Sequence, residues 1–257
     1  MNEKILVISR HGVAPQNPNG VGSLDSLTDE TVPRLYTKGW AFMPFIGQNF
    51  VYPQKSLVRH SPKARTLMTA KALMAGAYAR KPVPATRADL EIFPEIDALM
   101  SKADVQVAPE LDYAGIVLNM DAIKREGQEK YIRNWFANPE ADSYDGMKIT
   151  PGTQVMRRQH KFLFDTLAKM ISAEKQFGVA VTHGAIIEGS ILPLLNSARA
   201  KPSYSIDDFG GQIEMEENAH LALQGEGKDY QAKLVIKGRD FLVDFKRFMN
   251  AGANISS

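Results

Sequence analysis

The chain has 257 residues, a formal net charge of +2 and no cysteine. Its hydrophobic fraction of 44% suffices for a sizeable buried core and is too high for a disordered chain. The lack of cysteine excludes disulfides, thiolate metal sites and cysteine nucleophiles. The nearly balanced charge argues against nucleic acid as a partner, and no apolar run approaches the roughly 18 residues of a membrane span. We therefore expect a soluble, cytoplasmic protein whose chemistry depends on five histidines.

Short apolar runs alternate with amphipathic stretches along the chain. Residues 4–9 (KILVIS) predict a buried strand, and residues 13–34, rich in Pro, Gly, Asn and Asp, predict a long loop. Further elements are expected in this order: helix 33–50, strand 56–59, helix 61–78, a third strand within 83–93, helix 121–136, loop 138–151, a long helix from about 155 to 171, strand 178–182, a helix to about 195, strands 219–224 and 232–236, and a terminal helix 240–249.

This alternation predicts an α/β fold, with three α/β/α layers and a mostly parallel central sheet. No linker-like segment divides the chain. We therefore expect a single domain over residues 1–257, with a helical and loop insertion around 97–150 that covers the site.

Three of the expected strands end in polar clusters, namely Ser9–Gly12 (SRHG), Arg59–Ser61 (RHS) and Thr182–Gly184 (THG). Parallel strands bring their carboxyl ends to one edge of the sheet, where ligands of open α/β sheets bind. A helix beginning behind each cluster adds free N–H groups. Arginine supplies bidentate donors to phosphate oxygens, and a neutral imidazole can attack phosphorus. The sequence therefore predicts a phosphoryl site at this edge.

The same clusters carry a family resemblance. Ser9–Gly12 resembles the Arg-His-Gly signature of the histidine phosphatase superfamily, the phosphoglycerate-mutase-like proteins. Residues 61–65 (SPKAR), followed by Thr69 and Ala70, are similar to its second motif, and residues 179–184 (VAVTHG) to its last. Weaker similarities lie at 35–39 (LYTKG) and 150–152 (TPG). The matches follow the family's order and cover most of the chain.

The resemblance implies a role for each matching position. His11 would be the nucleophile that becomes phosphohistidine, and Arg10 and Arg65 would bind the phosphoryl oxygens. His183 would be the second catalytic histidine. The expected substrate-binding set is Arg10, Arg65, Asn17, His183, Gly184 and His60. Since the family usually has Ser or Thr at the position of His60, we expect this histidine to line the pocket without reacting.

The general acid has two candidates. The family places a glutamate shortly after its third strand, and Glu95, in the segment FPEID, fits that setting best. Glu91 is the alternative, because its spacing from the start of the expected third strand is closer to that of shorter members. Related acid phosphatases have an aspartate directly after the second histidine, where this chain has Gly184.

The resemblance implies a phosphomonoesterase that acts through a phosphohistidine on a small phosphorylated substrate, without cofactor or metal. A phosphoglycerate-type mutase is one alternative, although Val13 and Ala14 replace the Glu-Ser that mutases usually have after the signature. A non-catalytic protein that binds a phosphorylated ligand is another.

A metal site is disfavoured because two arginines would repel a cation. A homodimer is one option for assembly. We expect Arg157, Arg158 and Lys161 to form a solvated helix face.

Overall fold

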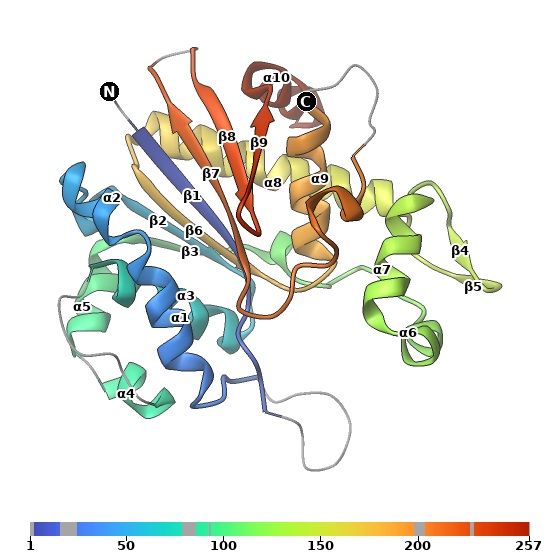
Figure 1. Ribbon diagram of the computed structural model, residues 1–257, viewed down its shortest axis with the longest axis horizontal. Helices are drawn as coiled ribbons and strands as arrows, with labels where there is room; N and C mark the ends of the chain where they lie inside the picture. Colours follow the sequence, from blue (N-terminus) through green and yellow to red (C-terminus); the bar gives the residue numbers. More distant parts are fainter. Residues whose placement is uncertain are drawn as a thin grey trace.

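A seven-stranded sheet forms the centre of the molecule, with the strand order β3-β2-β6-β1-β7-β8-β9 (Figure 1). The computed structural model describes residues 3–15, 25–78, 86–92, 94–197, 204–226 and 229–256. The strands are β1 (Glu3–Arg10), β2 (Ser56–His60), β3 (Asp104–Val107), β6 (Phe177–Thr182), β7 (Asn218–Gln224), β8 (Gln231–Ile236) and β9 (Arg239–Val243). Neighbours among β3, β2, β6 and β1 are parallel, whereas β7, β8 and β9 each run antiparallel to the strand before them. The predicted α/β fold with a mostly parallel sheet is confirmed.

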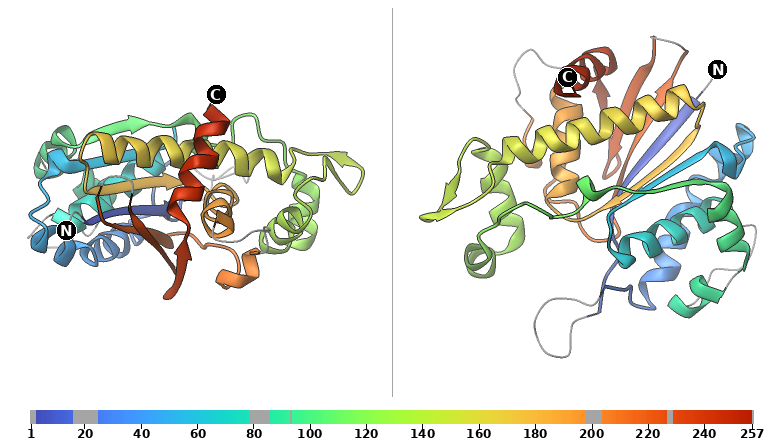
Figure 2. Two further views of the ribbon diagram at one scale, coloured as in Figure 1. Left: turned by 90° about the horizontal axis from the view of Figure 1, so that it is seen from above. Right: turned by 180° about the vertical axis from the view of Figure 1, so that it is seen from behind.

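Helices cover both faces of this sheet (Figure 2). One face carries α1 (Thr31–Trp40), α2 (Met43–Gln48), α3 (Ala64–Tyr78), α4 (Arg87–Ile92) and α5 (Pro94–Lys102), and the other carries α8 (Gly152–Ser172), α9 (Ile186–Ser197) and α10 (Phe245–Ser256). In the described part of the chain, no helix combines the length and apolarity needed to cross a membrane.

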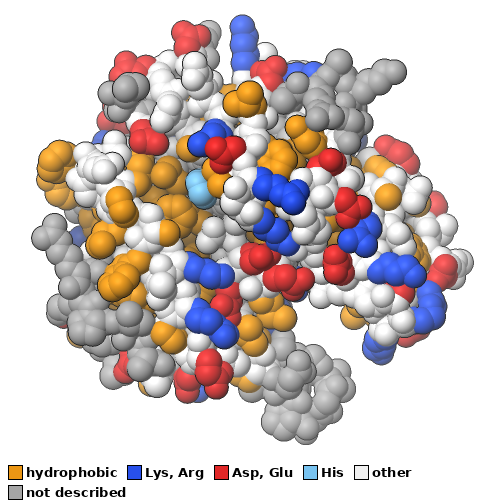
Figure 3. Space-filling view, in the orientation of Figure 1, with side chains coloured by type: hydrophobic (Ala, Val, Ile, Leu, Met, Phe, Trp, Pro, Cys, Tyr) orange, Lys and Arg blue, Asp and Glu red, His pale blue; other side chains and the backbone are white. Residues whose placement is uncertain are grey.

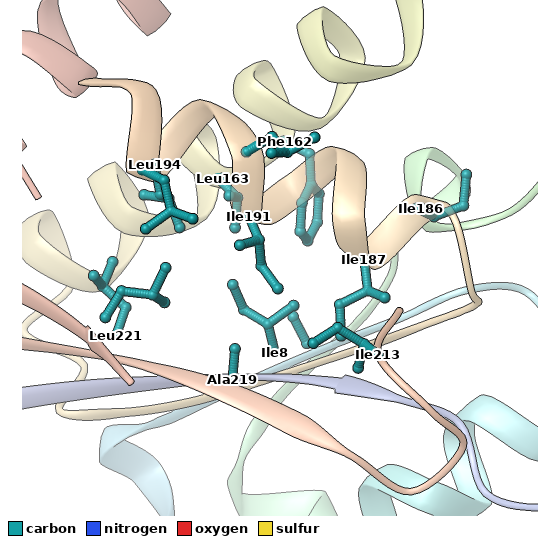
Figure 4. Packing of buried hydrophobic residues seen from close by; sticks show 14 of the residues in the cluster. Ile8, Phe162, Leu163, Ile186, Ile187, Ile191, Leu194, Ile213, Ala219 and Leu221 are labelled. Carbon is teal, nitrogen blue, oxygen red and sulfur yellow. The ribbon is translucent and has the colours of Figure 1, made fainter. Parts of the chain in front are cut away.

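The alternation of side chains along β1 explains the two layers. Ile5 and Val7 belong to the core beneath α1–α5, whereas Leu6 and Ile8 belong to the core beneath α8–α10. Successive side chains of a strand point to opposite faces, so a strand buried on both faces is an unbroken apolar run. Figure 4 shows the second core, where Ile187 and Ile191 of α9 lie over Ile8.

A projecting unit extends to one side of the sheet (Figure 1). It consists of α6 (Met120–Glu126), α7 (Gln128–Ala137) and the hairpin of β4 (Ser143–Tyr144) and β5 (Met147–Lys148). Figure 3 shows that this unit carries charges of both signs and borders an open notch in the molecular face. The region expected as an insertion, 97–150, thus contains this unit, but it also contains the edge strand β3 of the central sheet.

The third strand is the main error of the sequence prediction. Residues 87–92 form α4, whereas the strand at this edge is β3, in the segment DVQV. Three of the four β3 residues are only partly buried and the last is exposed. A short edge strand of this kind lacks the continuous apolar run of a central strand, so periodicity does not reveal it.

Three local breaks divide elements that were predicted as continuous. The helix expected over 33–50 splits into α1 and α2, and Pro44 lies in the first turn of α2. The helix expected over 121–136 splits at Gly127, whose φ is 87°. Residues 240–243, expected in the terminal helix, belong to β9 instead, because Lys237 and Gly238 both have positive φ and reverse the chain into a hairpin.

Helices α1 and α3 cross at a pair of glycines. A Cβ atom on Gly39 would lie 2.2 Å from the carbonyl oxygen of Leu73, and one on Gly76 would lie 2.0 Å from that of Tyr36. The two backbones are therefore in direct contact, and only glycine fits at the crossing. This contact matters for function because α3 begins at the sheet edge where the polar clusters meet.

We expect Gly76→Ala to lower the free energy of unfolding by about 1–3 kcal/mol, because the added methyl group meets backbone that cannot move aside. The matched control is Gly47→Ala on α2, where a Cβ atom meets nothing within 4 Å. That control should be neutral or stabilise by up to about 1 kcal/mol. Denaturant unfolding of both variants tests this, and equal stabilities would contradict the close crossing.

Candidate active site

The carboxyl ends of β1, β6 and β2 meet at one edge of the sheet. Arg10 is paired with Thr182 in the parallel register, and the N–H of His11 continues the ladder to the carbonyl of Thr182 at 2.9 Å. The N–H of Ser61 donates to the carbonyl of Val181 at 3.3 Å. All three predicted polar clusters therefore lie at the same edge of the sheet.

His11 and His183 form a close pair, with ring centroids 4.9 Å apart and ring planes at 65°. The Nδ1 atom of His11 lies 2.6 Å from the carbonyl oxygen of Gly12, to which its N–H donates. This hydrogen bond selects the tautomer whose lone pair is on Nε2. The arrangement therefore leaves Nε2 as the nucleophilic nitrogen.

Burial keeps both rings uncharged. The pKa of His11 is lowered to about 4, chiefly by burial and in smaller part by the guanidinium groups of Arg65 and Arg10, whereas the hydrogen bond to Gly12 opposes this shift. Burial also lowers the pKa of His183, with His11 and Arg65 as further causes. A nucleophile needs a free lone pair, so these shifts make His11 competent at neutral pH.

Arg10 lies directly beside the turn that follows β6. Its side chain is 5% exposed, and its Nη1 atom donates to the carbonyl of Ile213 at 2.7 Å. A Cβ atom on Gly184 would lie 2.8 Å from the Cζ atom of Arg10 and 3.0 Å from the Nε2 atom of Gln128. A side chain at 184 would thus displace the guanidinium, and α7 brings Gln128 to the site, which the sequence did not indicate.

Residues of the second motif hold the two histidine loops. The Oγ atom of Ser61 lies 2.9 Å from Nε2 of His183. The hydroxyl of Thr69 accepts the N–H of Gly12 at 3.0 Å and donates to the carbonyl of Arg65 at 2.8 Å. Helix α3 therefore connects the loop after β1 with the loop after β2.

The first turn of α3 is capped from far away in the sequence. The carboxylate of Asp25 accepts the N–H groups of Ala64 at 3.0 Å and Arg65 at 3.2 Å. The negative charge of Asp25 also raises the pKa of His11, opposing burial. Asp25 comes from the predicted long loop, and no local signal marks it as a cap.

The loop after β3 supplies two carboxyl groups that the sequence reading missed. The Oδ1 atom of Asp112 lies 3.5 Å from Nε2 of His183 and accepts the N–H of Tyr113 at 2.8 Å. The Oε2 atom of Glu110 is buried and has no hydrogen-bond partner among the described residues. The hydroxyl of Tyr113 donates to the carbonyl of Gly184. The signal that could have found this loop is its place after the true third strand.

Two side chains of helix α8 hold this loop by donating hydrogen bonds to the backbone carbonyls of the loop. The guanidinium of Arg158 donates to the carbonyls of Pro109, Asp112 and Ala114, and Nε2 of Gln159 donates to that of Glu110 at 2.6 Å. The prediction of a solvated helix face is therefore wrong for Arg158, which is half-buried, whereas Arg157 is exposed.

The sequence-predicted acids lie elsewhere or outside the described side chains. Glu95 is exposed in the first turn of α5, a helix that packs on α3, β3 and the 3₁₀ turn η1 (Pro53–Lys55) before β2. Its neighbour Asp97 pairs with Lys71, well beyond the first turn of α3, at 2.9 Å. The structure therefore does not bring Glu95 to the histidine pair. The side chain of Glu91 lies outside the described parts.

The two remaining residues of the predicted substrate-binding set are His60 and Asn17. His60, at the end of β2, is 6% exposed, and its Nδ1 atom lies 2.7 Å from the carbonyl of Ser61. Burial lowers its pKa, so it is a neutral residue at the same sheet edge. Asn17 lies outside the described residues.

We expect Arg158→Met to lower kcat by about 10- to 100-fold, because a loop displaced by about 1 Å misplaces the groups it carries. Arg157→Met is the matched control, since this exposed neighbour keeps the same helix and loses the same charge. Steady-state assays of both variants, with circular dichroism to check folding, measure the effect. Equal activities would show that the carbonyl contacts of Arg158 do not matter.

The lowered histidine pKa values also predict acid sensitivity. The unfolded chain binds protons on histidine near pH 6.5, whereas His11 in the folded chain binds one only near pH 4. The folded state is therefore favoured above pH 6.5, and this contribution is lost as pH falls towards 4, by up to about 1.4 kcal/mol per pH unit. Urea unfolding from pH 7 to pH 5 should show a shallower decline for His11→Asn than for wild type. Parallel curves would refute the shift.

No family model matches the sequence, and no curated protein is similar enough to count as a relative. Among solved structures, mycobacterial hydrolase 1 has 15% sequence identity and a TM-score of 0.51, over 92% of this chain and 99% of that one. Mycobacterial hydrolase 2 has 17% identity and a TM-score of 0.50, over 100% and 99% of the two chains. At these identities, what is shared is the fold. The chain therefore has the α/β fold of these two hydrolases, with helices on both faces of a central sheet.

Proposed function

We propose that the protein is a phosphomonoesterase in which a small phosphorylated substrate transiently phosphorylates His11. The observation that carries this proposal is the neutral His11 ring, whose Nδ1–H is held by Gly12 and whose ring centroid lies 4.9 Å from that of His183. Arg10 emerges from the same strand end, and the charge of Arg65 acts on both rings. A neutral nucleophile beside two guanidinium groups suits a phosphoryl dianion.

In the first step, the lone pair on Nε2 of His11 attacks phosphorus. The bond from phosphorus to the ester oxygen breaks, and that oxygen takes a proton from a carboxylic acid. The phosphoryl oxygens are neutralised by Arg10 and Arg65, while the carbonyl of Gly12 stabilises the charge on the phosphorylated ring through Nδ1–H. In the second step, water attacks phosphorus, the carboxylate takes its proton, and the phosphorus–nitrogen bond breaks to release inorganic phosphate.

Glu110 is the carboxyl group that best suits the proton transfer. Its Oε2 atom is buried and has no hydrogen-bond partner among the described residues, and it lies on the loop that brings Asp112 to His183. Asp112 is engaged differently, since its Oδ1 atom accepts the N–H of Tyr113 and lies near His183. We assign Asp112 to the orientation of His183. Both take precedence over Glu95, which is exposed on α5.

We expect His11→Ala to abolish hydrolysis of p-nitrophenyl phosphate and to remove the acid-labile phosphoenzyme trapped from labelled substrate. His220→Asn is the control, because this histidine lies on β7, next to Phe42 and outside the histidine pair. A chelator should leave the wild-type rate unchanged. Hydrolysis retained by His11→Ala would refute the nucleophile, and phosphoenzyme formation without release of inorganic phosphate would indicate a transferase.

The acid is tested with substrates whose leaving groups differ in basicity. Glu110→Gln should lose about 100-fold or more in kcat on an alkyl phosphate and much less on p-nitrophenyl phosphate, because only the poor leaving group needs a proton. Asp112→Asn should affect both substrates to a similar extent, and Glu95→Gln should resemble wild type. A larger alkyl-phosphate defect in Glu95→Gln would restore the assignment made from sequence.

A further inference from the structure

The loop of residues 210–217 passes beside Arg10 without regular secondary structure. It connects the 3₁₀ turn η3 (Ile206–Phe209) with β7, and Gly210 and Gly211 at its start both have positive φ. The side chain of Ile213 is fully buried and lies beside Ile187 of α9 (Figure 4). The end of the loop is bound to β1, where the N–H of Arg10 donates to the carbonyl of Glu217 at 3.0 Å and the N–H of Glu216 donates to the carbonyl of His11 at 3.3 Å. The peptide of Ile213, in contrast, is held by side chains.

The backbone of Ile213 connects two buried charged side chains, Arg10 and Glu188. The carbonyl of Ile213 accepts a hydrogen bond from Nη1 of Arg10 at 2.7 Å, and its N–H donates to Oε1 of Glu188 at 2.8 Å. Glu188 lies in the first turn of α9 and is completely buried. Both polar groups of Ile213 are therefore held, one by each charged side chain.

Glu188 is not explained by packing. Its Oε2 atom is buried and has no partner among the described residues, and the same holds for Nε of Arg10. Burial raises the pKa of Glu188, while the N–H of Ile213 and the charge of Arg10 oppose this rise. A carboxyl group inside an apolar core costs free energy that an apolar side chain would not. Glu188 lies behind Arg10 and holds the peptide to which Arg10 is bonded, and this contact offers a functional reason for burying the carboxyl group.

We propose that Glu188 is a positioning residue, which holds Arg10 in place for the phosphoryl group by fixing the peptide of Ile213. The inference rests on the proposed function, because it takes Arg10 to be a phosphoryl ligand. Without the bond from Glu188, the carbonyl of Ile213 is free to turn away, and the guanidinium loses its anchor. The effect therefore appears in binding of the phosphoryl group, before any proton reaches the leaving group.

The test compares two substitutions of Glu188. Glu188→Gln keeps a carbonyl that accepts the N–H of Ile213, and it should stay within about threefold of wild type in KM and in inhibition by inorganic phosphate. Glu188→Met fills similar space without an acceptor, and both constants should rise about tenfold, roughly the value of one buried hydrogen bond. Ser197→Ala is the control, since Ser197 lies in the last turn of α9 and its hydroxyl donates to the carbonyl of Leu194.

A double variant separates positioning from general damage. In an Arg10→Met background, Glu188→Met should weaken the binding of inorganic phosphate no further, because the group it positions is already gone. Isothermal titration with inorganic phosphate measures this without turnover, and thermal unfolding checks that each variant is folded.

Three outcomes overturn the inference. Phosphate binding by Glu188→Met equal to wild type would show that Arg10 is held without Glu188, and an equal loss in Glu188→Gln would show that the acceptor is not what matters. Additive effects in the double variant would assign the loss to the fold. These results leave the proposed function standing, whereas a wild-type protein that neither hydrolyses phosphomonoesters nor binds phosphate would overturn both.

Discussion

The parallel pairing of β1 with β6 is the constraint on which the rest of the site depends. Because Arg10 is in register with Thr182, the two strands end at the same level, and His11 and His183 follow directly. A shift of one residue would turn every side chain of β1 to the other face and would exchange its two core contacts. The register of β1 with β6 therefore places the histidine pair.

Burial gives this pair its chemistry. Removing imidazole from water disfavours its charged form, and the guanidinium groups nearby act in the same direction. The result is an uncharged histidine pair in a positively charged setting, which suits a phosphoryl dianion. Acidic groups surround the setting without neutralising it: Asp112 beside His183, Asp25 at the start of α3, and Glu188 behind Arg10.

Two irregular loops bring the remaining groups to the sheet edge, and both are fixed by side chains from helices. Arg158 and Gln159 of α8 hold the carbonyls of the loop after β3, which carries Glu110 and Asp112. Glu188 of α9 holds the peptide of Ile213, which in turn holds Arg10. Irregular backbone has no ladder to define it, so precise placement at a site has to come from such contacts.

The sequence by itself determined the fold class, the central strands and the residues at their ends, because a strand buried on both faces is a continuous apolar run and its last residues are polar. The SPKAR segment also indicated a helix close to the start of α3, which begins at Ala64. Only the tertiary structure decided which carboxyl groups approach the histidines. The edge strand β3 is short and half-exposed, so periodicity did not reveal the loop after it, which places Asp112 3.5 Å from His183. The roles of Arg158, Asp25 and Glu188 arise from contacts between residues far apart in the chain, which no local pattern encodes.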